Sequence, residues 1–136
     1  MYEKWKSRAF PYKIRTKCEH IFFTPREGGR MEETMQNEYE LKKLMCDIGK
    51  RIYDRNMVAA NDGNISVKLN DNEFLCTPTG VSKGFMTPDF ICKVDAQGNV
   101  IQANKGFRPS SEIKMHMRVY QKRPDVGAVV HAHPTF

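Results

Sequence analysis

The sequence has no long apolar run, no internal repeat and no low-complexity segment. A membrane-spanning helix needs about 18 consecutive apolar residues, and no stretch approaches that length, so we expect no membrane-embedded protein. The N-terminus also lacks the basic stub and apolar stretch that are typical of a secretory signal. We therefore expect a cytoplasmic protein.

The sequence also has few cysteines and no CxxC pair. Its four cysteines, Cys18, Cys46, Cys76 and Cys92, lie far apart. Without a secretory signal, this spacing favours reduced, buried thiols over a disulfide framework or a zinc knuckle.

Positive charge is concentrated at one end of a chain of 136 residues, which is room for one modest domain. Residues 1–30 hold eight of the 22 Lys and Arg residues but only three of the 16 acidic ones, so the remainder is almost neutral. Basic residues interleaved with aromatic ones are able to contact nucleic-acid phosphates. We favour a poorly ordered extension instead, and expect no nucleic-acid partner.

The domain is therefore expected to span residues 34–136, preceded by a basic extension at residues 1–33. That extension is either disordered or the product of a misassigned start site. Residues 27–31 read like an in-frame translation of a purine-rich ribosome-binding stretch, which would make Met31 or Met35 the natural start.

Hydrophobic periodicity predicts alternating helices and strands. Apolar residues at three- and four-residue spacing predict a helix over 34–56, and period-two alternation predicts hairpins at 65–77 and 90–103. A short helical turn is expected at Thr87–Asp89. A second helix is expected from Pro109–Glu112 to about Lys122, followed by a buried strand over 126–131. The order predicts a layered α/β or α+β domain.

His131 and His133 lie at the end of that apolar strand. Side chains at i and i+2 of a strand share a face, so both imidazoles are able to reach one metal ion. Glu112, placed just inside the second helix, is able to fold back beside them, and His₂Glu is an accepted zinc set. The alternatives are structural histidines and a first-turn carboxylate that either belongs to a capping box or is favoured by the helix dipole.

Three polar loops are candidates for a phosphate site. Their residues offer backbone N–H groups, small side chains or hydroxyls: Gly63, Asn64, Thr79, Gly80, Ser110 and Ser111. Each is also an ordinary turn or cap residue. His116, one turn past Glu112, is expected on the helix surface or in the core rather than in the site.

Four stretches of the chain, in order, resemble the class II aldolase/adducin family. They are Asp62–Val67, Thr77–Gly80, Pro109–Glu112 and Arg123–His133. The resemblance covers residues 35–136. It implies a three-layer α/β/α fold around a mostly antiparallel sheet, a catalytic zinc and a homotetramer.

The resemblance also implies residue roles and a reaction. It assigns zinc ligation to His131, His133 and Glu112, gives Glu112 the proton shuttle, and makes the three polar loops the phosphate cradle. The implied reaction is retro-aldol cleavage of a ketose 1-phosphate, such as L-fuculose 1-phosphate, to dihydroxyacetone phosphate and an aldehyde through a zinc-stabilised enediolate.

Departures from the family pattern leave alternatives open. The family's third zinc histidine and its proton-donating tyrosine lie beyond the HxH strand, so we expect a C-terminally truncated member. One alternative is a non-catalytic metal-binding or interaction domain. Others are related sugar-phosphate dehydratases and epimerases, although epimerases typically have Asp where Glu112 stands. Adducin heads lack the metal ligands.

Overall fold

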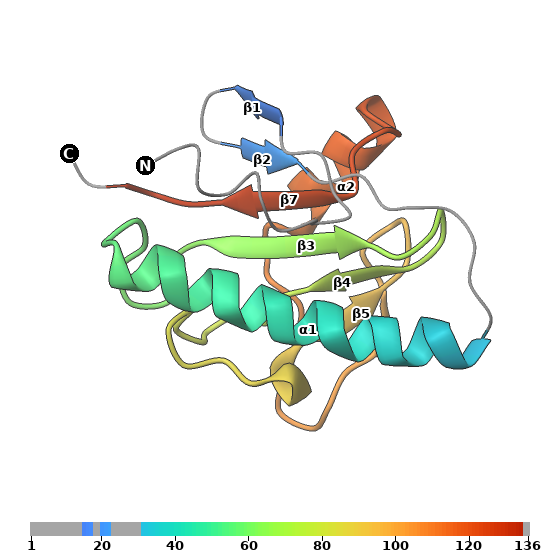
Figure 1. The fold of residues 1–136 in the computed structure, drawn as a ribbon, viewed down its shortest axis with the longest axis horizontal. Helices are drawn as coiled ribbons and strands as arrows, with labels where there is room; N and C mark the ends of the chain where they lie inside the picture. Colours follow the sequence, from blue (N-terminus) through green and yellow to red (C-terminus); the bar gives the residue numbers. More distant parts are fainter. Residues whose placement is uncertain (1–14, 18–19, 23–30, 135–136) are drawn as a thin grey trace.

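The computed structural model describes residues 15–17, 20–22 and 31–134, with side chains from residue 37 onward. The elements in chain order are β1 (Arg15–Lys17), β2 (His20–Phe22), α1 (Met31–Asp54), β3 (Asn64–Lys68), β4 (Phe74–Cys76), η2 (Pro88–Phe90), β5 (Cys92–Val94), β6 (Val100–Gln102), α2 (Ile113–Lys122) and β7 (Ala128–His131). Figure 1 shows their arrangement.

A five-stranded sheet of order β6-β5-β4-β3-β7 forms the centre of the molecule. Every neighbouring pair within it is antiparallel, in agreement with the expected mostly antiparallel sheet. β1 and β2 pair separately, and β2 lies alongside β7 (Figure 1). The last strand, β7, therefore joins β3 across about 60 residues of chain and brings the HxH segment to the start of β3.

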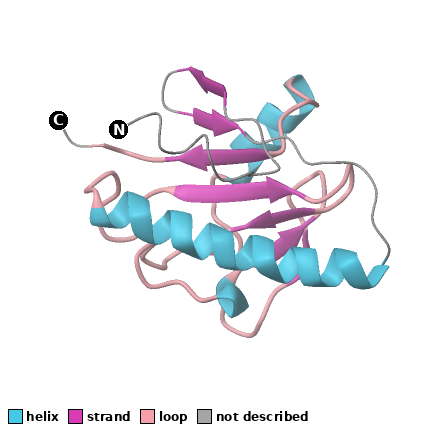
Figure 2. Ribbon diagram, in the orientation of Figure 1, coloured by secondary structure: helices cyan, strands magenta, loops and turns pink. Residues whose placement is uncertain are grey.

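The two helices lie against opposite faces of the sheet, because strand residues alternate between two apolar clusters. On β4, Phe74 and Cys76 belong to the cluster that contains α2, whereas Leu75 belongs to the cluster that contains α1. Figures 1 and 2 show α1 in front of the strands and α2 behind them.

Most expected elements are present. The hairpins β3–β4 and β5–β6 and the turn η2 form where alternation and turn residues predict them. Helix α1 begins at Met31, three residues before the expected start. Glu112 was expected just inside the second helix, but it is the N-cap residue before Ile113.

The expected basic extension falls mostly outside the described residues, apart from the short β1–β2 pair. Its disorder and the start-site hypothesis therefore stay predictions. Among the described residues, no helix combines the length and apolar character that crossing a membrane requires.

Candidate metal centre

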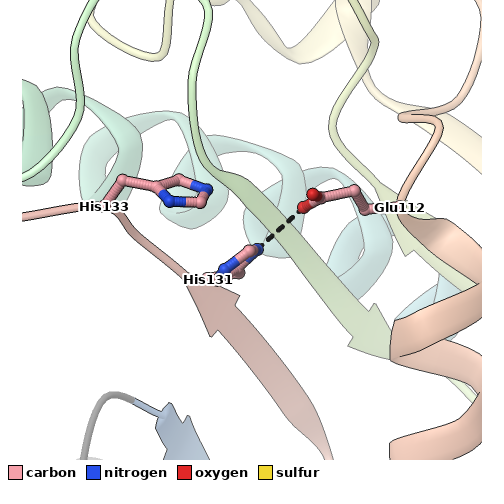
Figure 3. A group of neighbouring side chains, drawn as sticks. All are labelled: Glu112, His131 and His133. Carbon is pink, nitrogen blue, oxygen red and sulfur yellow. Dashed lines mark hydrogen bonds and ion pairs between the residues drawn. The ribbon is translucent and has the colours of Figure 1, made fainter.

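Backbone hydrogen bonds position both histidines, His131 at the end of β7 and His133 two residues beyond it. His131 is the register partner of Asn64, and the His133 backbone N–H donates to the Met57 carbonyl at 3.0 Å. Because side chains at i and i+2 share a face, the two imidazoles lie together, with ring centroids 4.5 Å apart. The predicted pairing of His131 and His133 at one strand end is therefore present (Figure 3).

Glu112 reaches the same place from the start of α2. It occupies the N-cap position, yet its side chain makes no capping hydrogen bond. Its Oε2 instead accepts a hydrogen bond from His131 Nδ1 at 2.8 Å, as the dashed line in Figure 3 shows. The capping-box alternative is therefore wrong for this residue, whereas the helix-dipole alternative stays a prediction.

Glu112, His131 and His133 together form a group that suits a divalent cation. One potential ligand atom from each lies within 4.8 Å of the others. Zinc takes imidazole nitrogen and carboxylate oxygen at about 2.0–2.2 Å in tetrahedral sites, and His₂Glu is one of its catalytic donor sets. The donor chemistry fits zinc, and three protein ligands leave one position for a fourth.

The local electrostatics keep Glu112 ionised. The hydrogen bond from the Asn64 amide, at 2.5 Å, is the main cause that lowers the pKa of its carboxyl group, and the His131 hydrogen bond acts in the same direction. Partial burial opposes both effects. An ionised carboxylate is the form that ligates a metal.

The three candidate phosphate loops meet beside this group through Thr77. The Thr77 hydroxyl accepts from the Ile65 N–H, next to Asn64, and the Thr77 carbonyl accepts from the Ser110 N–H at 3.1 Å. A β-bridge between Pro78 and Pro109 pairs the loop of Thr79 and Gly80 with the loop of Ser110 and Ser111. The three candidate loops are thus neighbours, whereas phosphate binding stays a prediction.

The individual loop residues differ in how available they are. Thr79, Gly80 and Ser111 are exposed, and Gly63 is buried. The Ser110 hydroxyl accepts from the Glu112 N–H at 3.3 Å. Asn64 is only 5% exposed, and its side chain lies between Glu112 and His116.

His116 lies in the core, one of the two places expected from the sequence, but its polar partners behind Glu112 were not predicted. His116 is buried on α2 and bonds to Asn64 and Ser66, and the Tyr120 hydroxyl also bonds to Ser66. The spacing of Glu112, His116 and Tyr120 at i, i+4 and i+8 was a usable signal, because such residues share one helix face.

The part of the chain that holds this site matches a known family model. Residues 43–136 match the class II aldolase and adducin N-terminal domain. The chain belongs to the class II aldolase and adducin family. The family resemblance of the four sequence stretches is therefore confirmed.

Named members of the family carry out different reactions. The chain is 38% identical over 95 residues to 3-oxo-tetronate 4-phosphate decarboxylase from Haemophilus influenzae, covering 70% of this chain and 44% of the relative. It is 41% identical over 92 residues to L-fuculose phosphate aldolase from Methanocaldococcus jannaschii, covering 68% of this chain and 48% of the relative.

A solved family structure supports the fold. The L-fuculose 1-phosphate aldolase from Glaciozyma antarctica superposes with a TM-score of 0.71 at 21% identity, covering 80% of this chain and 46% of that one. At this identity the likeness concerns the fold alone. The chain spans less than half the length of these family members.

Proposed function

We propose that the complete protein is a zinc-dependent aldehyde-lyase of the cytoplasm. It cleaves a ketose 1-phosphate of the L-fuculose 1-phosphate type to dihydroxyacetone phosphate and an aldehyde. We further propose that the complete chain forms the three-layer α/β/α fold and the homotetramer implied by the family resemblance.

One observation carries the proposal. Glu112 stands at a helix N-terminus but leaves that helix uncapped, and its carboxylate meets the His131 and His133 imidazoles in one group. A carboxylate kept only for helix stability would bond to the first-turn N–H groups. The observed arrangement supports a metal-ligating role for all three residues.

The chain's own residues would divide the chemistry as follows. A zinc ion held by Glu112, His131 and His133 supplies a Lewis acid for the negative charge that develops on the substrate oxygens. Glu112, ionised at neutral pH, would accept the substrate proton on a carboxylate oxygen. Hydrogen bonds donated by Asn64 and His131 hold that carboxylate in place. His131 and His133 fix the site on a strand of the central sheet.

The three polar loops would hold the substrate's phosphate. Exposed Thr79 and Gly80 and the loop before α2 lie at the same end of the sheet as Glu112. Binding a phosphate away from the bond that breaks supplies orientation, which lowers the entropic part of the barrier.

A second candidate reaction is decarboxylation of a 3-oxo acid phosphate. The relative from Haemophilus influenzae, named as such a decarboxylase, is 38% identical to the chain. Loss of carbon dioxide from a 3-oxo acid leaves the same kind of negative charge beside a carbonyl, so the same metal centre would serve. A related dehydratase or epimerase and a non-catalytic metal-binding domain are the further alternatives.

The test is zinc-dependent release of dihydroxyacetone phosphate from L-fuculose 1-phosphate by the complete protein, followed with a coupled NADH assay. We expect activity with zinc, none with EDTA, and a loss of about 100-fold or more in Glu112→Gln, since a positioned acid–base group contributes that much. Glu40→Gln, at an exposed position on helix α1, is the matched control and should retain full activity.

Three outcomes would contradict the proposal. Product formation by Glu112→Gln at the rate of the unsubstituted chain would remove the assigned proton shuttle. Carbon dioxide release from 3-oxo-tetronate 4-phosphate without ketose cleavage would assign the decarboxylase reaction instead. A folded, zinc-loaded complete protein without any turnover would favour the non-catalytic domain.

A further inference from the structure

A line of hydrogen bonds runs from the core to the Glu112 carboxylate. The Tyr120 hydroxyl lies 2.8 Å from Ser66 Oγ, which lies 2.6 Å from His116 Nδ1. The other ring nitrogen of His116 bonds to Asn64 Oδ1, and Asn64 Nδ2 donates to Glu112 Oε2 at 2.5 Å. The line therefore joins β3 and α2 directly behind the candidate metal centre.

The ionised Glu112 carboxylate at one end of this line sets the direction in which its hydrogen bonds are donated. An ionised carboxylate only accepts hydrogen bonds, so the Asn64 amide nitrogen faces Glu112 and the amide oxygen faces His116. His116 must then donate from Nε2, and an Nδ1 that carries no proton accepts from the Ser66 hydroxyl. The Ser66 oxygen accepts in turn from Tyr120. Each donor points toward the carboxylate.

Burial makes His116 the rigid part of the line. His116 is 1% exposed and Ser66 is 0% exposed, whereas the Glu112 side chain is 43% exposed. Among the described residues, every buried side-chain nitrogen and oxygen has a hydrogen-bond partner. Removing the His116 N–H would leave the Asn64 oxygen without this donor in a buried place, and the carboxamide would be free to turn.

We propose that His116 is a positioning residue that acts through Asn64 to hold the Glu112 carboxylate in its metal-ligating orientation. The inference deepens the proposed function and rests on the proposed metal centre at Glu112, His131 and His133. Groups that hydrogen-bond to metal ligands orient them, and their loss weakens metal binding about 10- to 100-fold.

The first test is a titration of the whole chain with Co²⁺, read by its visible absorption and by competition with a chromogenic chelator. We expect His116→Leu to weaken Co²⁺ binding about tenfold. His116→Gln keeps an N–H donor for Asn64 and should recover most of the affinity.

Tyr120→Phe is the matched core control. It removes the hydrogen bond that lies farthest from Glu112, between Tyr120 and Ser66, and leaves the bond between His116 and Asn64 in place. We expect a lower midpoint of urea unfolding with unchanged Co²⁺ affinity. Equal losses of affinity in Tyr120→Phe and His116→Leu would assign the effect to general core stability and overturn the inference, as would a folded His116→Leu with full affinity.

A second test needs neither metal nor a substituted chain. Long-range ¹H–¹⁵N correlation spectra report which ring nitrogen of a histidine carries the proton. We expect His116 to be protonated at Nε2 and bare at Nδ1, and the opposite tautomer would overturn the inference even if a His116 variant fails to fold.

Failure of the proposed metal centre would look different. If Glu112→Ala and His131→Ala leave Co²⁺ binding unchanged, the metal lies elsewhere and the proposed function fails. In that case the expected tautomer would still support the hydrogen bond from His116 to Asn64. A loss of Co²⁺ affinity in His116→Leu alone would overturn the inference that His116 acts on the metal through Glu112.

Discussion

Gly63 immediately precedes Asn64 and has a backbone conformation that residues with a side chain rarely adopt. Its φ is +80°, and a Cβ there would lie 2.5 Å from Val58 Cγ1 and 3.0 Å from the His131 carbonyl oxygen. Both contacts are too close for real atoms to tolerate without movement. Glycine here thus lets the start of β3 approach the strand that carries the histidines.

Gly63→Ala should therefore lower the free energy of unfolding by about 2–4 kcal/mol, from backbone strain together with overpacking. Gly80→Ala is the control, because Gly80 also has a positive φ of 73° but nothing lies near its missing Cβ. It should cost only about 1–2 kcal/mol. Urea unfolding measures both, and equal losses would contradict the steric explanation.

The residues of the candidate centre differ in how far the sequence predicts them. The grouping of His131 with His133 is predicted from strand periodicity, although β7 ends at His131, and that of Glu112 is predicted from its place at the start of a helix that returns to that strand. That of His116 is not, because its partners Asn64 and Ser66 lie on β3, about 50 residues away. Helical spacing predicts the face of His116 but not the strand that the face meets.

At the scale of elements, the hairpins are predictable and the sheet order is not. Alternation and a turn specify β3–β4 and β5–β6 because their partners are neighbours in the chain. The pairing of β3 with β7 has no local signal, since it depends on α2 crossing the sheet between them. That pairing is nevertheless what brings Asn64 beside His131.

Strand β4 should be the element least tolerant of side-chain loss. Leu75 on this strand is 0% exposed and packs among residues of α1 and β3. Leu75→Ala should destabilise the fold by about 3 kcal/mol, since a buried leucine leaves a cavity. Val100→Ala on edge strand β6, where Val100 is 53% exposed, should cost less than about 1 kcal/mol. Similar costs in thermal unfolding would contradict this core assignment.

For the whole molecule, buried thiols and a buried phenol should make stability depend on alkaline pH. Burial raises the pKa of Cys76 from 9.0 to about 12 and also raises that of Tyr120. The unfolded chain then loses these protons at lower pH than the folded chain does. Unfolding therefore releases protons between pH 9 and about 12, and stability falls as the pH rises through that window.

Urea unfolding at several pH values from about 8 to 11 measures this slope, which is at most about 1.4 kcal/mol per pH unit for one group. Cys76→Ala should flatten part of it. A free energy of unfolding that stays constant or increases over this range would contradict the assigned burial of these groups.

We propose that, in the whole molecule, Glu112, His131 and His133 bind zinc. Zinc-edge X-ray absorption of the chain loaded with one equivalent of zinc tests it most directly. We expect nitrogen and oxygen ligands at about 2.0–2.1 Å, an imidazole signature, and loss of that signature in the His131→Ala, His133→Ala double variant. A sulfur shell at about 2.3 Å, or an unchanged spectrum in the double variant, would contradict it.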